Sequence, residues 1–227
     1  RVANTHKFED AQSGARPYFL FFGRLSKEKG ILTLVKAFLW ATGLANGSAD
    51  MRSSDQDVQV LPDAWDLHIV GDGPEREAIE QLIASAGPQA ESRIHLLGYK
   101  SGEDLQREVG NARFSVLSSE WRENMPYSGL ESLAAQTPII GASIGGIPEL
   151  VEEDKTGFTF ESGNITDVRD GLLKAAAVGQ SAYGVMQHQC AEYVAAHCRQ
   201  QAYAKQLERK YFGLTKLRSK NQGRSEE

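Results

Sequence analysis

Cysteine is scarce in this chain of 227 residues, which contains only Cys190 and Cys198. Two cysteines in one helical-looking region provide no disulfide framework. They also lack the ligand spacing of a zinc finger, since His188 and His197 do not complete that pattern. We therefore expect two reduced thiols, no metal ligands, and a cytoplasmic location.

The sequence also lacks long apolar runs and an excess of positive charge. No stretch approaches the roughly 20 apolar residues of a membrane-spanning helix, and the polar start does not resemble a secretory signal. The 25 basic and 30 acidic residues give a net charge of −5, which argues against nucleic acid as a partner. A hydrophobic content of 41% is nevertheless ordinary for a globular domain with a real core.

Both ends of the chain are polar. The chain begins with Arg1 rather than Met, and we interpret residues 1–17 as a linker from a preceding domain. Residues 213–227 are charged and aperiodic, which predicts a disordered tail. Its basic residues leave peripheral association with the inner face of a membrane open, but Glu226 and Glu227 favour a solvated tail.

Between these ends, short apolar segments alternate with helical patterns. We predict strands at 18–22, 66–70, 93–98, 113–119, 138–143 and 156–160. Helices are expected at 27–40, around 79–86, at 103–110, at 128–136, after Gly146, and from Asp167 almost to Phe212. The polar segment 43–63 reads as a long surface loop. The alternation predicts one α/β domain at 18–212, with a Rossmann-like, doubly wound parallel sheet of about six strands and helices on both faces.

Ligands of such a sheet bind beyond the carboxyl ends of its strands, so the turns after the strands are the candidate site. Gly23 and Arg24 follow the first strand, and Lys29 lies where the next helix begins. Two cations beside a helix N-terminus suit a diphosphate. Other turns contain glycines that permit close backbone approach, namely Gly71, Gly73, Gly145 and Gly146.

The turn after the fourth strand contributes two acids, Glu123 and Glu131. A helix that starts near Tyr127 would place Glu131 in its first turn, so we expect both carboxylates to face the mouth of the crevice together. A pair of acceptors matches the vicinal hydroxyls of a ribose and a hexose. Without the other loops, stabilisation of the helix dipole would be the preferred explanation of the two acids.

Four segments, in order, resemble the C-terminal domain of retaining group 1 (family 4) glycosyltransferases: FFGRLSKEKGILTLVKAF, LHIVGDGPERE, RIHLLGYKSGEDL and ENMPYSGLESLAAQTPIIGASIGGIPELVEEDKTGFTF. The resemblance implies one half of a GT-B fold and a bacterial hexosyltransferase of polysaccharide biosynthesis. It implies a UDP- or GDP-linked sugar as substrate, retention of configuration, and no metal or other cofactor. The acceptor, a sugar or lipid-linked sugar, would bind an N-terminal domain absent from this chain, so we expect the isolated domain to be inactive in transfer.

The resemblance also assigns roles to single residues. Arg24 and Lys29 match the basic pair on the donor diphosphate, Glu123 matches the acid beside the donor sugar, and Glu131 matches the acid that holds the ribose. The expected catalytic residues are Glu123, Arg24 and Lys29. The loop that touches sugar and phosphate corresponds to Asn124, Met125, Pro126, Tyr127 and Ser128, and the base pocket corresponds to Gly98, Tyr99 and Lys100.

Gln136 departs from the family, which usually has Gly at this helix end, where a left-handed conformation is common.

An NAD-dependent oxidoreductase is disfavoured because the first turn, Gly-Arg-Leu-Ser, lacks G-x-G-x-x-G. A sugar-nucleotide epimerase half and a non-catalytic nucleotide-sugar-binding module stay open as alternatives. His68 and His95 lie inside predicted strands, and we interpret them as packed. Trp121 borders the acidic loop, where contact with a ligand and simple exposure are equally favoured.

Overall fold

The computed structural model describes residues 16–45 and 59–197, and within them six strands form one parallel sheet. The strands are β1 (Tyr18–Phe22), β2 (Asp66–Val70), β3 (Ile94–Gly98), β4 (Phe114–Leu117), β5 (Ile139–Ala142) and β6 (Gly157–Phe160). Their order is β3-β2-β1-β4-β5-β6, and all neighbours run parallel. The predicted doubly wound α/β fold and its six strands are therefore confirmed.

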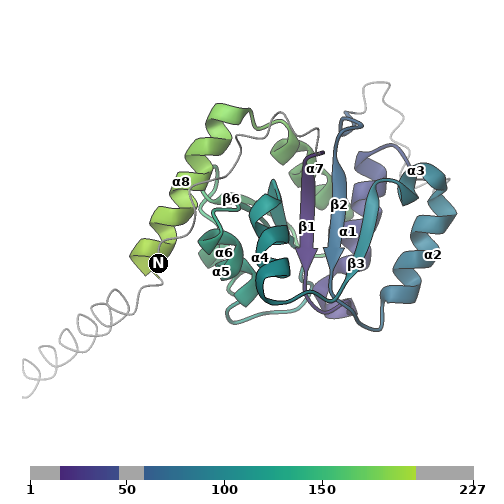
Figure 1. The fold of residues 1–227 in the computed structure, drawn as a ribbon, viewed down its shortest axis with the longest axis horizontal. Coiled ribbons are helices and arrows are strands. Elements are labelled where there is room, and N and C mark those ends of the chain that lie inside the picture. Colours follow the sequence, from purple (N-terminus) through teal and green to yellow (C-terminus); the bar gives the residue numbers. More distant parts are fainter. Residues whose placement is uncertain (1–15, 46–58, 198–227) are drawn as a thin grey trace, which may run out of the picture.

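Helices connect the strands and cover both faces of the sheet (Figure 1). They are the 3₁₀ turn η1 (Lys27–Lys29), α1 (Ile31–Ala41), α2 (Arg76–Ala86), α3 (Pro88–Glu91), α4 (Gly102–Asn111), α5 (Tyr127–Ala134), α6 (Ile147–Leu150), α7 (Ile165–Ala176) and α8 (Gln180–His197). On one side α1 packs against α2 and α7, and on the other α5 packs against α4, α6 and α8.

The predicted single helix from Asp167 is instead two helices, α7 and α8, separated by residues 177–179. Helix α7 begins earlier than expected because the Asn164 side chain caps it, accepting bonds from the N–H groups of Thr166 and Asp167. The predicted continuation to Phe212, the N-terminal linker, most of the 43–63 loop and the tail 213–227 lie outside the described residues.

Continuous apolar strands explain why the sheet is buried on both faces. All five residues of β1 are buried, as are all four of β4. Phe19 stacks on Trp65, and Phe114 contacts the rings of Phe158 and Tyr183. Residues that alternate along such strands pack against helices on opposite sides, which is typical of a parallel sheet.

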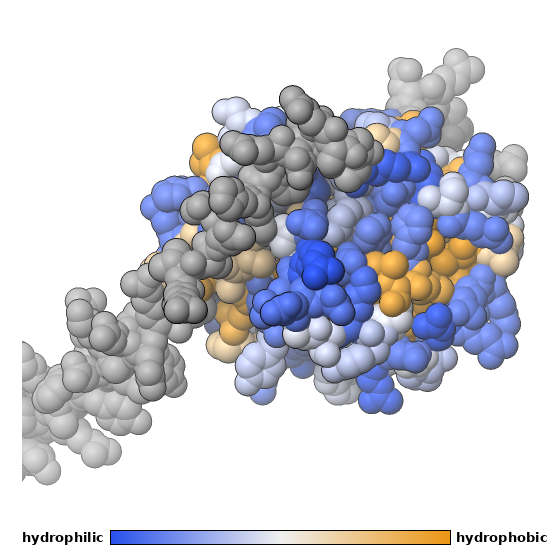
Figure 2. All heavy atoms as spheres, viewed as in Figure 1, coloured by the Kyte–Doolittle hydropathy of each residue, from blue (hydrophilic) through white to orange (hydrophobic). Residues whose placement is uncertain are grey.

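One face of the molecule divides into areas of different polarity. Figure 2 shows strongly hydrophilic residues over α4 beside a hydrophobic area over β3. All five residues of β3 are apolar or histidine, and four of them are only partly buried. Of the helices that the structure describes, none is both long enough and apolar enough to cross a bilayer.

The end of α5 has the left-handed backbone that the sequence led us to expect. Gln136 has a φ of 59°, and its N–H bonds to the carbonyl of Leu133, while the Thr137 N–H bonds to that of Ser132. This hydrogen-bonding pattern closes a helix and usually contains glycine, because a side chain strains the left-handed region.

Replacement of Gln136 by glycine should therefore stabilise the domain. Relief of the left-handed strain outweighs the greater entropy that glycine gives to the unfolded chain, so we expect a gain of roughly 0.5–1 kcal/mol in the free energy of unfolding. Urea unfolding followed by circular dichroism measures it. Gln136→Ala is the matched control, because alanine keeps the strain. Equal stability of the two variants would contradict the explanation.

Candidate functional site

The order of the strands places a switch point between β1 and β4. From β1 the chain winds outward to β2 and β3, and it then returns to β4 and winds the other way. The connections after β1 and β4 therefore leave the sheet in opposite directions and open a crevice at the carboxyl ends of these two strands. The turns that contain the predicted basic and acidic residues are the walls of this crevice.

The two turns are in direct contact. The N–H of Glu120 donates to the carbonyl of Glu28 at 2.9 Å, and the hydroxyl of Ser118 donates to the carbonyl of Lys29 at 2.8 Å. Gly30, which has a φ of 62°, lies so close that a Cβ atom there would be 1.9 Å from the carbonyl oxygen of Ser118. Only glycine allows the start of α1 to press against the end of β4.

This contact brings together the side chains of Lys29 and Glu123. The Lys29 Nζ lies 2.8 Å from a Glu123 carboxylate oxygen, and the two side chains are 30% and 20% exposed. The Ser119 hydroxyl donates to the same carboxylate oxygen. Because an ammonium has three N–H donors, Lys29 can keep this ion pair and still donate to an oxygen of a ligand.

The turns after β2 and β5 complete the crevice. The N–H of Leu25 donates to the carbonyl of Asp72 at 2.9 Å. On the other side, the N–H of Gly146 donates to the carbonyl of Glu123 at 2.6 Å. A side chain at any of four glycines in these turns would collide with the backbone of the neighbouring turn: Gly71, Gly73, Gly145 and Gly146. These glycines therefore pack turn against turn, which supports the loop that contains Glu123.

The N-terminus of α5 opens beside this loop. The helix begins after Pro126, no side chain caps it, and its first turn contains no acid. Its backbone N–H groups therefore offer positive potential to an anion. The residues before and at this start are largely exposed, including Asn124, Met125 and Tyr127. Arg24 is also exposed, at the other wall of the crevice.

Glu131 does not lie where we expected it. It is the fifth residue of α5 and so belongs to the second turn, because the helix begins at Tyr127. Glu123 pairs with Lys29, whereas Glu131 borders a hollow of about 630 Å³ between α4 and α5. The hollow is lined by Gly102, Leu105, Gln106, Arg107, Val109, Gly110, Glu131, Ala134, Ala135 and Gln136. The two acids therefore do not lie together at one mouth of the crevice.

The segment assigned to the base pocket is not among the residues that line this hollow. Tyr99 is 79% exposed, and Lys100 forms an ion pair with Glu108 of α4. Burial raises the pKa of Glu108, but hydrogen bonds from Lys100 and His68 outweigh it and hold that pKa below its ordinary value. Gly98 has a φ of 68°, so it turns the chain from β3 toward α4.

Sequence reasoning missed the serines that hold the acidic loop. Ser118 bonds to the first turn, Ser119 bonds to Glu123, and the hydroxyl of Ser162 donates to the carbonyl of Ser119 at 2.9 Å. The sequence feature that could have indicated them is the pair Ser118-Ser119 directly after a buried strand, where hydroxyls can reach the backbone of neighbouring turns. Trp121 is 69% exposed beside the same loop.

The chain resembles known glycosyltransferases in sequence and in fold. The chain is 26% identical over 161 residues to the alpha-D-kanosaminyltransferase of Streptomyces kanamyceticus, an alignment that covers 70% of this chain and 36% of that protein. The structure of Anabaena HepE in complex with UDP superposes with a TM-score of 0.67 at 19% identity, covering 86% of this chain and 49% of HepE. The C-terminal domain of the group 1 glycosyl transferase LpcC from Francisella tularensis superposes with a TM-score of 0.64 at 17% identity, covering 81% of this chain and 87% of that domain.

These structures support the fold, and the family follows from the sequence. The chain spans about a third of the length of the kanosaminyltransferase that it resembles. The family described as glycosyl transferases group 1 matches residues 3–193, which is most of the chain. This protein therefore belongs to the group 1 glycosyl transferases.

Proposed function

We propose that this chain is the donor-binding domain of a retaining glycosyltransferase, which moves a hexose from a nucleotide diphosphate sugar to an acceptor hydroxyl. The observation that carries the proposal is the contact of Lys29 with Glu123 at the switch point of the sheet. A cation and an acceptor that meet across a crevice can bind a phosphate and a sugar hydroxyl side by side.

The diphosphate would lie between the two walls of the crevice. Lys29 and the exposed Arg24 supply positive charge from the β1 turn, and the uncapped start of α5 supplies backbone N–H groups from the other side. These groups stabilise the negative charge that develops on the leaving nucleotide as the bond to the sugar breaks. In this role they replace a divalent cation, so the donor site needs no metal.

The nucleoside would occupy the hollow between α4 and α5. Its volume of about 630 Å³ is adequate for a base and a ribose. Leu105, Val109 and Ala134 provide apolar surface for a ring, and the carboxylate of Glu131 can accept bonds from both ribose hydroxyls. HepE, whose structure contains UDP, has the same fold, which supports UDP; GDP is an alternative from the sequence resemblance.

The acceptor would bind a second domain. This chain covers 49% of HepE and 36% of the kanosaminyltransferase, so these relatives contain room for a further domain of similar size. Transfer requires that the acceptor hydroxyl and the donor sugar be held together in the reactive geometry. A sugar or lipid-linked sugar is the proposed acceptor.

Titration of the chain with UDP, GDP and ADP tests the donor site. We expect one of these nucleotides to bind with equal affinity in Mg²⁺ and in EDTA, and Lys29→Ala and Glu131→Gln each to weaken that binding at least about tenfold, since each removes a charged hydrogen-bond partner. Isothermal titration calorimetry measures the affinities.

Two exposed residues provide matched controls. Lys27→Ala removes a cation from the same 3₁₀ turn as Lys29, and Glu91→Gln removes an exposed carboxylate on α3, away from the crevice. Both should bind nucleotide like the unchanged chain. Equal losses in Lys27→Ala and Lys29→Ala would show that only the net charge of the turn matters, and would contradict the assigned diphosphate contact.

Assays of transfer test whether a second domain is required. We expect the chain alone, saturated with nucleotide sugar, to transfer no detectable sugar to an acceptor, because we assign the binding of that acceptor to a second domain. Release of free sugar and of labelled product is measured by chromatography. Transfer at ordinary enzymatic rates by the chain alone would contradict the proposal that the acceptor binds a second domain, even if nucleotide binding is confirmed.

A further inference from the structure

A cluster of potential metal ligands lies away from the donor crevice, on β2 and β3. Asp66, His68 and His95 each offer one ligand atom, and these atoms all lie within 4.8 Å of one another. Asp66 is the first residue of β2, and His68 is in the middle of that strand. The donor crevice is at the other, carboxyl end, beyond Val70.

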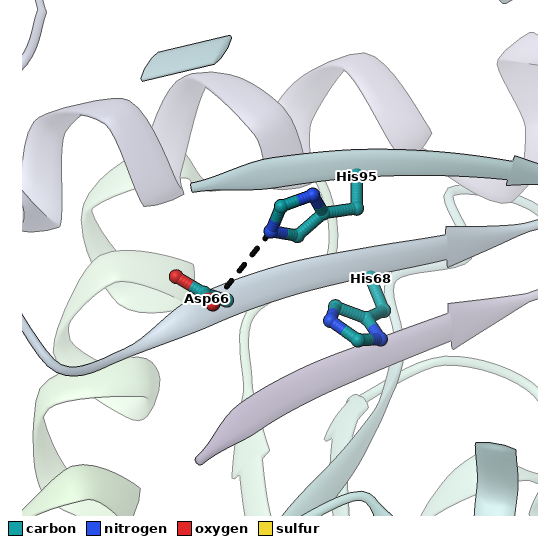
Figure 3. A group of neighbouring side chains, drawn as sticks. All are labelled: Asp66, His68 and His95. Carbon is teal, nitrogen blue, oxygen red and sulfur yellow. Dashed lines mark ion pairs between the residues drawn. The ribbon is translucent and has the colours of Figure 1, made fainter. Parts of the chain in front are cut away.

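The register of the sheet creates this cluster. His68 and His95 are direct partners in the parallel pairing of β2 with β3, so both side chains project from the same face. Asp66 precedes His68 by two residues and therefore projects from that face as well. Figure 3 shows both imidazole rings turning a nitrogen toward Asp66, and His95 Nε2 lies 3.6 Å from Asp66 Oδ2.

A carboxylate behind His68 fixes the orientation of its ring. His68 Nδ1 lies 3.3 Å from Glu108 Oε2, so an N–H at this position donates to the carboxylate and leaves Nε2 with a free lone pair. The ring also stacks on Tyr18, with centroids 3.8 Å apart. A histidine held from behind by a carboxylate is the usual support of a metal-binding imidazole.

The carboxylate of Asp66 is buried beside the two imidazole rings. Asp66 is 6% exposed, and its two carboxylate oxygens have different partners. Oδ1 lies 3.2 Å from Arg16, and Oδ2 faces His95. One oxygen therefore stays available as a ligand.

We propose that Asp66, His68 and His95 form a zinc site, with His68 Nε2, His95 Nε2 and Asp66 Oδ2 as ligands and a water in the fourth position. Zinc commonly takes such nitrogen and oxygen ligands in a tetrahedral arrangement, whose ligand atoms are about 3.3 Å apart. Movements of about 1.5 Å or less by the side chains would complete that geometry. The His95 side chain is 35% exposed and that of His68 is 20% exposed, so the ion has a path from solvent.

This site would join the edge strand β3 to β2 and so stabilise the sheet. It does not rest on the proposed transfer function, because its ligands come from β2 and β3 and lie before the carboxyl ends that border the donor crevice. Arg16 and Arg93 are the cations nearest to Asp66, and they reduce the charge that the site offers. They favour a moderate affinity over a very tight one.

Titration of the chain, first stripped with EDTA and then dialysed, with Zn²⁺ tests the site. We expect one equivalent of Zn²⁺ to bind and to raise the midpoint of thermal unfolding. The variants His95→Gln and Asp66→Asn each lack one ligand, so their affinity for Zn²⁺ should be at least about tenfold lower. Co²⁺ in place of Zn²⁺ should show the visible absorption of a four-coordinate ion, which reports the ligand set directly. Circular dichroism without metal shows that the variants stay folded.

The matched control is His188→Gln on α8, where a 74% exposed histidine pairs with Glu192 at 3.3 Å. It should bind zinc like the unchanged chain.

Glu108→Gln should weaken zinc binding about 10- to 100-fold while the Co²⁺ spectrum keeps its form, because Glu108 orients the ligand His68 without being a ligand itself. Absence of binding, or equal affinity in His95→Gln, Asp66→Asn and the unchanged chain, would overturn the proposal. The affinity for UDP should not depend on zinc. Failure of the zinc titration would therefore leave the proposed donor site untouched, and failure of the nucleotide titration would leave the proposed zinc site untouched.

Discussion

The parallel pairing of β1 with β4 is the constraint on which the rest of the structure depends. Phe19 faces Phe114 and Leu20 faces Ser115 across this pair, and every other strand adds outward from it. The pairing brings two turns that are about 90 residues apart in sequence into direct contact, as the 2.8 Å bond between Lys29 and Glu123 shows. Without it neither turn would have a partner, and the basic and acidic groups would be two unrelated surface loops.

Much of this arrangement could be predicted from the sequence. The bounds of β1 and β2 were predicted correctly. β1 is continuously apolar, β2 contains three apolar residues, and a glycine follows each strand. Glu131 was expected in the first turn of α5, facing the same mouth as Glu123, but it is the fifth residue of the helix and belongs to its second turn. The helix starts at Tyr127 as predicted, and Glu131 borders the hollow between α4 and α5. The left-handed backbone of Gln136 agrees with the expectation from the resemblance, since the family usually has glycine at this helix end.

What the sequence cannot reveal is register between strands. His68 and His95 are 27 residues apart, and nothing local says that β2 and β3 align them as direct partners. Each histidine alone is best explained as a packed residue, which is how we interpreted them. The contacts of His68 with Glu108 of α4 and with Tyr18 of β1 are likewise long-range in sequence. The two cysteines were therefore a poor guide to the proposed metal site, because its candidate ligands come from strands.

The two proposed sites use different ends of the same strands for a physical reason. At the carboxyl ends, glycines let turns pack backbone to backbone, so free N–H groups and long side chains such as Lys29 face a ligand from several directions. At the amino ends, side chains of neighbouring strands stand in fixed rows about 5 Å apart, which is the spacing at which imidazoles and carboxylates can share one small cation. Flexible anionic donors suit the first arrangement, and a single ion suits the second. A sheet of this order can therefore hold a substrate site beyond the carboxyl ends of its strands and an ion site nearer their amino ends.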